Sequence, residues 1–205
     1  MSFPTAFARA IAPLAILAAA VPASAAAQSA ELAKVEAHLL GVQTMTASFT
    51  QTDQRGRSAA GTLQLRRPGR IRFQYGSGDL LLVADGSKLT FIDYLVGQKS
   101  AWPLGRTPLG VLLAANPNLK NRAQVLLNPD PRIVVVRARD PRQFGTLILA
   151  FIREPGAPAG LKLYGWTAID AQNKKTTVKL SDQRYNVAVP DSAFAYAEPK
   201  KRSKK

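Results

Sequence analysis

The hydrophobic pattern changes from a helical to a strand period near residue 42. Apolar side chains recur at helical spacing between Ser29 and Gly41, so we predict a helix that Ser29 caps and Gly41 ends. Its apolar face is expected to hold Leu32, Val35, Leu39 and Leu40. From Met45 to Thr52, apolar and polar positions alternate instead, which predicts a half-buried strand.

Alternation continues along most of the chain and predicts an α+β domain built on a long antiparallel meander. Further strands are expected at 62–66, 70–75, 80–84, 88–93, 133–138, 146–152, 161–167 and 176–180, with a last edge strand around Phe194 and Tyr196. The links are too short for helical crossovers, which favours antiparallel pairing. One short apolar helix is expected within 107–117, because Thr107 can cap it and Pro108 suits its first position.

Two of the predicted strands are apolar on both faces. These are the runs at 80–83 and 147–152. An antiparallel sheet with one solvated face alternates cleanly, so a second apolar face needs a covering. Either one face lines an apolar interior while the other packs on helices, or core covers both faces; the pattern allows both.

The first residues resemble a targeting segment. Arg9 precedes an apolar run at 10–21, and small residues follow at 23–27. This order predicts a secretory signal peptide over 1–27 and an exported mature domain over 28–199. An uncleaved anchor helix is the alternative, although the apolar run is shorter than the roughly 20 residues of a membrane span.

Composition limits the chemistry that the chain can perform. The chain has no cysteine, which excludes disulfides, thiol catalysis, CxxC zinc sites and a lipid-modified N-terminal cysteine. His38 is the single histidine, so a catalytic triad or a multi-histidine metal site lacks material. Asp85 and Asp93 fit turns better than acid–base pairs. We therefore expect no enzyme and no metal or cofactor; a periplasmic lipid hydrolase would need a nucleophile beside a base.

The charge is strongly basic and uneven. There are 28 Lys and Arg against 13 Asp and Glu, a formal net charge of +15, and five of the last six residues are basic. We predict that the tail at 200–205 is disordered; attraction to anionic lipid headgroups is the functional alternative.

The segment 66–73 interleaves basic and apolar residues. Nucleic-acid binding is not expected for an exported protein, and Arg70 and Arg72 fit a solvated strand face. Arg67 differs, because it shares strand parity with Leu63 and Leu65 and so points to the apolar side. A guanidinium there needs acceptors, which the free carbonyls at the end of a short helix would supply.

Five motifs together resemble the LolA family of periplasmic lipoprotein carriers. They are Phe49-Thr50-Gln51, Gly61-Thr62-Leu63, Arg67-Pro68-Gly69-Arg70-Ile71-Arg72-Phe73, Val83-Ala84-Asp85-Gly86 followed by 89–93, and Thr107-Pro108-Leu109. Their order and spacing match over about residues 30–199. Thr90, Gly110 and Ile71 depart from the bulkier or aromatic residues usual in the family.

The resemblance implies an unclosed β-barrel of about eleven strands with short lid helices. It implies a monomeric shuttle that takes lipoproteins by their acyl chains from an inner-membrane ABC-type release complex to an outer-membrane receptor, with Arg67 as the latch of the lid. The expected cavity residues are Phe49, Leu63, Leu65, Ile71, Phe73, Leu82 and Phe91, and the expected lid residues are Leu39, Leu40, Leu109, Val111 and Leu112. A binder of another lipid or glycolipid on the same scaffold is the alternative.

Overall fold

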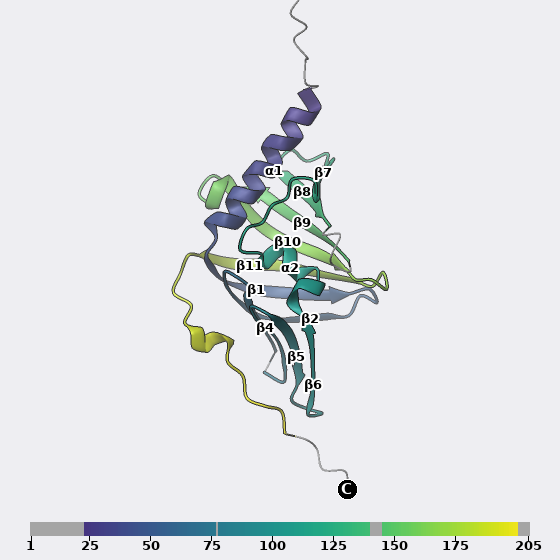
Figure 1. Cartoon of the computed structure of the whole chain (residues 1–205), viewed down its shortest axis with the longest axis vertical. Helices are drawn as coiled ribbons and strands as arrows, with labels where there is room; N and C mark the ends of the chain where they lie inside the picture. Colours follow the sequence, from purple (N-terminus) through teal and green to yellow (C-terminus); the bar gives the residue numbers. More distant parts are fainter. Residues whose placement is uncertain (1–22, 77, 140–144, 201–205) are drawn as a thin grey trace, which may run out of the picture.

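A single antiparallel sheet forms the body of the molecule. The computed structural model describes residues 23–76, 78–139 and 145–200. Eleven strands follow the order β6-β5-β4-β3-β2-β1-β11-β10-β9-β8-β7 (Figure 1). The edge strands β6 and β7 are not paired with each other within this part of the chain, so the predicted unclosed barrel of about eleven strands is confirmed.

The elements have the following bounds. The strands are β1 (Thr44–Asp53), β2 (Ser58–Arg66), β3 (Arg70–Tyr75), β4 (Leu80–Asp85), β5 (Lys88–Asp93), β6 (Gln98–Pro103), β7 (Ala123–Leu126), β8 (Ile133–Ala138), β9 (Thr146–Arg153), β10 (Leu161–Ile169) and β11 (Lys175–Tyr185). The helices are α1 (Ala23–Gly41) and α2 (Leu109–Leu113), with 3₁₀ turns η1 (Leu104–Arg106), η2 (Pro158–Gly160) and η3 (Asp191–Phe194).

The topology determines which segment crosses the open side of the sheet. The chain meanders from β1 out to the edge strand β6, and a second meander returns from the other edge, β7, to β11 beside β1. The connection at 104–122, which contains η1 and α2, must therefore pass from one edge to the other. In Figure 1, α2 lies in front of the middle of the sheet.

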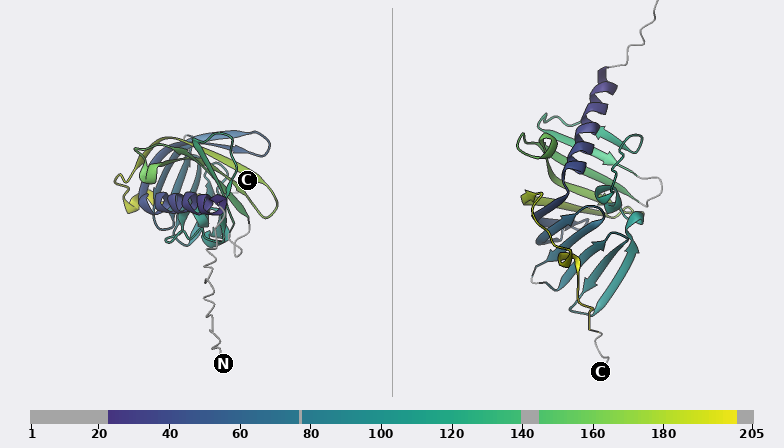
Figure 2. Two further views of the ribbon diagram at one scale, coloured as in Figure 1. Left: turned by 90° about the horizontal axis from the view of Figure 1, so that it is seen from above. Right: turned by 60° about the vertical axis from the view of Figure 1, so that its left-hand side comes forward.

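The main core lies on the concave face of the sheet. Buried residues alternate along the strands, as in β3, where Ile71 and Phe73 are buried between half-buried polar neighbours. Val35 and Leu39 of α1 belong to the same buried cluster as these strand residues. Figure 2 shows α1 lying across the curved sheet. Alternation with one face toward a helical layer is the pattern that the sequence predicted.

The C-terminal segment covers part of the opposite, convex face. Residues 187–199, here called the strap, run along the outside of β3–β5 (Figure 2). Leu81, Val83 and Ile92 are buried beneath its Val189 and Phe194. The strap therefore covers the outer face of β4, while on its inner face Ala84 is buried and Leu80 and Leu82 are half-buried.

One prediction about this region is wrong and a second is incomplete. The residues around Phe194 form the 3₁₀ turn η3 and not an edge strand. Arg70 and Arg72 lie on the outer face as predicted, and the Arg70 side chain is 39% exposed, but both also bind the strap: Arg70 pairs with Asp191, and Arg72 Nη1 donates to Ala195 O at 2.8 Å. The apolar outer face of β4 needs a cover, and the arginines of β3 hold that cover through its carboxylate and carbonyls.

Several boundaries also differ from the predictions. Helix α1 begins by Ala23 rather than at Ser29, because the preceding alanines favour helix more than the serine favours a cap. The predicted signal peptide lies mostly outside the described residues, and it stays a prediction. The short edge strands β6 and β7 were not predicted. An edge strand pairs on one side only, and β6 is exposed along most of its length, so neither carries a clear alternation.

Candidate functional site

Five of the seven expected cavity residues form the floor of the concave face. Their side chains are 0–2% exposed and belong to one buried cluster: Phe49, Leu63, Leu65, Ile71 and Phe73. Aromatic rings meet edge to face in this floor, with centroids 5.1 Å apart for Phe49 and Phe73 and 6.0 Å apart for Phe73 and Trp166. This floor is continuous and apolar, and helix side chains cover it.

The other two expected cavity residues lie nearer the β6 edge. Leu82 and Phe91 are paired across β4 and β5 and are half-buried, so the apolar face continues outward less completely covered. Trp102 of β6, opposite Leu89, extends it further and is 48% exposed. The sequence analysis missed Trp102, because its strand was not predicted; a lone tryptophan in a polar segment was the available signal.

The helices place most of the expected lid residues over the floor. Leu39 of α1 and Leu109 and Leu112 of α2 are buried in the same cluster as the floor. Leu40 is 48% exposed, so its placement on the buried face is wrong. It lies about 100° around the helix from Leu39, which leaves it on the outer side. Val111 lies within α2, and its side chain is outside the described residues.

Backbone carbonyls at the end of α2 are held by the turn between β2 and β3. Arg67 Nη2 donates to Leu112 O, and Arg67 Nη1 donates to Ala114 O at 2.9 Å. Between them, the backbone N–H of Gly69 donates to Leu113 O at 3.0 Å. We call these three bonds the clamp. Carbonyls at a helix C-terminus have no partner within the helix, so the clamp satisfies three consecutive acceptors.

The clamp guanidinium is charged but incompletely satisfied. Burial lowers the pKa of Arg67 to about 10, so the group stays protonated at neutral pH. Its Nε is buried with no hydrogen-bond partner among the described residues. An unpaired buried donor costs free energy, which makes this arrangement less favourable than one with every donor paired.

The turn that carries the clamp depends on glycine. Gly69 has φ +74°, and a Cβ added there would lie 2.6 Å from the Cα of Gly86, in the β4–β5 turn. The two turns therefore pack backbone to backbone. Sequence reasoning identified Arg67 but missed the part of Gly69, because a backbone N–H leaves no side-chain signal.

A groove borders the clamp on its outer side. Its volume is about 320 Å³, and it lies between α2, η1 and the two turns. Its lining comprises Pro68, Gly69, Gly86, Leu104, Gly105, Gly110, Leu113, Ala114 and Ala115. Helix α2 thus has side chains packed on its floor side and open space beside its clamped end.

A second contact ties α1 to the crossing segment. A carboxylate oxygen of Glu36 accepts the backbone N–H of Leu119, whose side chain is 1% exposed. Arg153 Nη2 donates to Glu31 Oε2 at 2.9 Å, which joins α1 to β9 as well. The two helical parts of the covering are therefore linked to each other and to the sheet.

His38 packs α1 against the sheet and the turn η2. It is 2% exposed, its Nδ1 lies 3.0 Å from Pro158 O, and its ring meets those of Phe151 and Tyr185 edge to face. Burial lowers the pKa of His38 from 6.5, and the nearby charge of Arg67 adds to this. The histidine is thus neutral in the folded protein at neutral pH, donating from Nδ1 to the carbonyl.

We expect the protein to lose stability as the pH falls below 6.5. The unfolded chain binds a proton at His38 before the folded chain does, so the free energy of unfolding decreases from pH 6.5 down to the lowered folded-state pKa. Urea unfolding between pH 7.5 and 5 measures this slope. His38→Gln should flatten it; an equal slope in that variant would assign the effect to other groups.

The two aspartates that the sequence placed in turns have structural roles. The predicted turn roles of Asp85 and Asp93 are confirmed: Asp85 accepts the N–H groups of Ser87 and Lys88, and Asp93 accepts those of Leu95 and Val96. Within the described ranges, His, Asp and Glu form no cluster of three that could hold a metal ion. The helices described here include none that is long and apolar enough to span a membrane.

Comparison with known proteins gives a consistent result. The family profile described as "Outer membrane lipoprotein carrier protein LolA" matches residues 40–197. Two proteins named outer-membrane lipoprotein carrier protein, from Chromobacterium violaceum and Legionella pneumophila, are each 28% identical, over 86% and 81% of this chain and 88% and 85% of their own. A crystal structure of a LolA superfamily protein from Nitrosomonas europaea is 12% identical, covers 81% of this chain and 95% of its own, and has a TM-score of 0.41. Because the profile spans most of the chain, this protein belongs to the LolA family of outer membrane lipoprotein carrier proteins.

Proposed function

We propose that this protein is a periplasmic chaperone that carries lipoproteins from the inner to the outer membrane by binding their acyl chains. The observation that carries the proposal is the apolar concave floor, closed by helices of which one is held at its end by the clamp. The names of the family and of its relatives support lipoprotein as the cargo. By the same kinship, an inner-membrane ABC-type release complex would load it and an outer-membrane receptor would unload it.

The packed interior fits a carrier that must also release. A lipoprotein with three acyl chains holds roughly 45 methylenes, and full burial at about 0.8 kcal/mol each would exceed 30 kcal/mol. Noncovalent affinities end near 20 kcal/mol, and such binding would not reverse. In this structure the buried side chains of α1 and α2 belong to the same packed cluster as the floor, so cargo must displace part of that packing. Closing the covering therefore opposes binding, and it favours release.

The residues divide into three roles under this proposal. The floor residues and the half-buried Leu82 and Phe91 contact acyl chains; Leu39, Leu109 and Leu112 cover the floor when it is empty; Arg67 stabilises that closed state. Cargo opens the covering only if it interacts better with the open state than with the closed one. The groove beside the clamped end leaves α2 room to move.

Copurification tests the identity of the cargo. The protein should be isolated from the periplasm under native conditions, and bound material should be identified by mass spectrometry. Acylated lipoprotein at a stoichiometric level is the expected result. Free phospholipid or glycolipid in its place would contradict the proposal and indicate a general lipid binder. Depletion should in parallel leave lipoproteins in the inner membrane.

A further inference from the structure

Three buried side-chain atoms have no hydrogen-bond partner among the described residues: Arg67 Nε, Gln183 Oε1 and Tyr185 Oη. Most buried polar groups in folded proteins are paired, and leaving one unpaired costs free energy. Each exception therefore needs a physical reason. The clamp uses the two terminal nitrogens of Arg67, so it gives no reason for the unpaired Nε, nor for Gln183 and Tyr185.

All three atoms come from one end of the central strands. Met45, near the start of β1, pairs with Leu65 of β2 on one side and with Tyr185 of β11 on the other. Arg67 directly follows β2, and its backbone N–H donates to Gln43 O at 2.8 Å. Arg67 and Tyr185 therefore flank the start of β1, next to the floor residue Leu65. We call the three unpaired atoms the polar end of the floor.

The sheet is split at the polar end. The ladder between β10 and β11 stops at the pair Gly165 and Lys179, whereas β11 continues along β1 to Tyr185. Gln183 spans the split, because its Nε2 donates to Leu163 O at 2.6 Å. A primary amide donates from its nitrogen and accepts at its oxygen. The bond to β10 thus uses a donor of Gln183 and leaves its acceptor unpaired.

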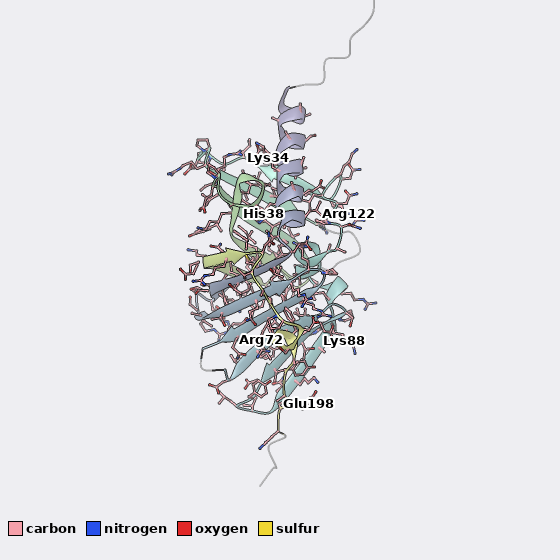
Figure 3. All side chains as sticks on the ribbon, turned by 90° about the vertical axis from the view of Figure 1, so that its left-hand side faces the viewer. Lys34, His38, Arg72, Lys88, Arg122 and Glu198 are labelled. Carbon is pink, nitrogen blue, oxygen red and sulfur yellow. The ribbon has the colours of Figure 1, made fainter. Side chains whose placement is uncertain are left out.

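The Tyr185 hydroxyl lies at the same split and under α1. Burial raises the pKa of Tyr185, and the backbone of Leu163 beside its oxygen lowers it by less. A backbone group that lowers the pKa of a phenol is a donor, so it gives the hydroxyl hydrogen no acceptor. The Tyr185 ring meets that of His38 edge to face, with centroids 5.8 Å apart. Figure 3 shows His38 at the end of α1 that lies next to the central strands.

We propose that the polar end binds the ester and amide groups through which acyl chains are attached to the cargo. This inference rests on the proposed function and names the part of the cargo that this end of the floor recognises. Every acyl chain begins at a carbonyl, and Arg67 Nε and Tyr185 Oη are donors that a carbonyl oxygen can accept. Gln183 Oε1 is an acceptor, which suits the N–H of an amide linkage.

Hydrogen bonds at the polar end add a selectivity that the floor lacks. Apolar contact depends on the area buried, so it does not distinguish an acyl chain from another alkyl chain of equal length. A site that pairs a polar group of its ligand rejects an analogue without that group, because its own buried atoms then stay unpaired. Cargo that supplies the missing partners removes the cost of the unpaired atoms.

Two synthetic ligands test the proposal. The first is an N-acetylated diacylglyceryl-cysteine peptide, and the second is its dialkyl counterpart, in which ethers replace the esters and the chain length is kept. Binding is measured by calorimetry, with chains short enough to keep both ligands monomeric. The protein should bind the ester ligand at least about tenfold more tightly than the ether ligand, and Tyr185→Phe should lose about fivefold of that preference.

The acceptor is tested by a change in the ligand. Methylation of the acetylated nitrogen removes its N–H and keeps the ester groups. This should weaken binding to the parent protein about fivefold. Gln183→Met lacks the acceptor oxygen, so the methylated and unmethylated ligands should bind that variant within about twofold of each other.

Tyr75→Phe is a matched control, because it removes the same hydroxyl from another buried tyrosine. The Tyr75 ring meets that of Phe49 edge to face at 5.1 Å, and its Oη donates to Gln51 Oε1 at 2.8 Å. Since this hydroxyl is already paired, Tyr75→Phe should lower the urea midpoint and change the ester preference by less than about twofold. Tyr185→Phe should keep or raise the urea midpoint, because it removes an unpaired buried donor.

The outcomes separate this inference from the proposed function. Equal binding of the ester and ether ligands by the parent protein would overturn the inference and leave acyl-chain binding intact. An ester preference that is the same in Tyr185→Phe as in the parent would also overturn it. So would a loss of stability in Tyr185→Phe equal to that in Tyr75→Phe, because the Tyr185 hydroxyl would then be satisfied in the free protein. Binding of neither ligand would contradict the proposed function itself.

Discussion

Arg67→Leu is expected to trap the carrier in its loaded form. The change removes two charge-assisted hydrogen bonds and leaves the carbonyls of Leu112 and Ala114 without their partner. Each such bond contributes about 1.5–3 kcal/mol, part of which water recovers, so we expect the closed state to lose about 2–3 kcal/mol. The equilibrium between bound and released cargo should then shift toward the bound form roughly 30- to 150-fold. Transfer of labelled lipoprotein from the loaded protein to acceptor outer membranes measures this.

The variant Arg67→Lys distinguishes the effect of the two-pronged guanidinium from the effect of its positive charge. Arg67→Lys keeps a cation at the position but reaches only one carbonyl with a single ammonium, so it should give an intermediate transfer rate. Circular dichroism and the urea midpoint should show both variants folded. Wild-type transfer by Arg67→Leu would exclude the latch, because the clamp would then contribute nothing to cycling.

Gly69→Ala should be strongly destabilising for a change that adds a single methyl group. Its φ of +74° is unfavourable for alanine, and the added Cβ would lie 2.6 Å from the Gly86 Cα, a backbone atom that cannot turn aside. We expect the free energy of unfolding to fall by about 3 kcal/mol or more. The shift would separate the β2–β3 turn from the β4–β5 turn and lengthen the bond from Gly69 N–H to Leu113 O.

The chain contains a matched control for this substitution. Gly56, in the β1–β2 turn, has nearly the same φ of +79°, and a Cβ there would meet nothing within 4 Å. Gly56→Ala therefore measures the conformational cost alone, about 1 kcal/mol. Urea unfolding of both variants gives the contribution of the contact with Gly86 by difference. Equal losses would show that the two turns do not press on each other.

Alternation made most of the sheet predictable, because a strand between a core and solvent repeats every two residues. Ile71 and Phe73 are buried between half-buried neighbours, as period two requires. The short strands β6 and β7 were missed, since each pairs on one side and neither buries a full face. Phe194 and Tyr196 were misassigned because alternating aromatics in a strap that lies on a sheet resemble a strand.

The candidate site was less predictable than the sheet. The parity of Arg67 with Leu65 indicated that its guanidinium turns inward and needs carbonyl acceptors, and the family resemblance assigned it to the lid. The contact between Gly69 in the β2–β3 turn and Gly86 in the β4–β5 turn could not be found in the same way, since a backbone contact between two turns has no side-chain pattern. The placement of Leu40 on the buried face was wrong, because neighbouring residues of a helix point about 100° apart and Leu39 already faces the core.

The pairing of β1 with β11 has a consequence for how the chain acquires its structure. The first and last strands meet in the middle of the sheet, with Phe49 opposite Leu180. An emerging polypeptide can form either hairpin series early, but it cannot join them until almost its entire length is available. Contacts between residues so distant in sequence slow folding. Such a delay keeps the newly made chain unfolded for longer, which suits the export that the signal peptide predicted at 1–27 would direct.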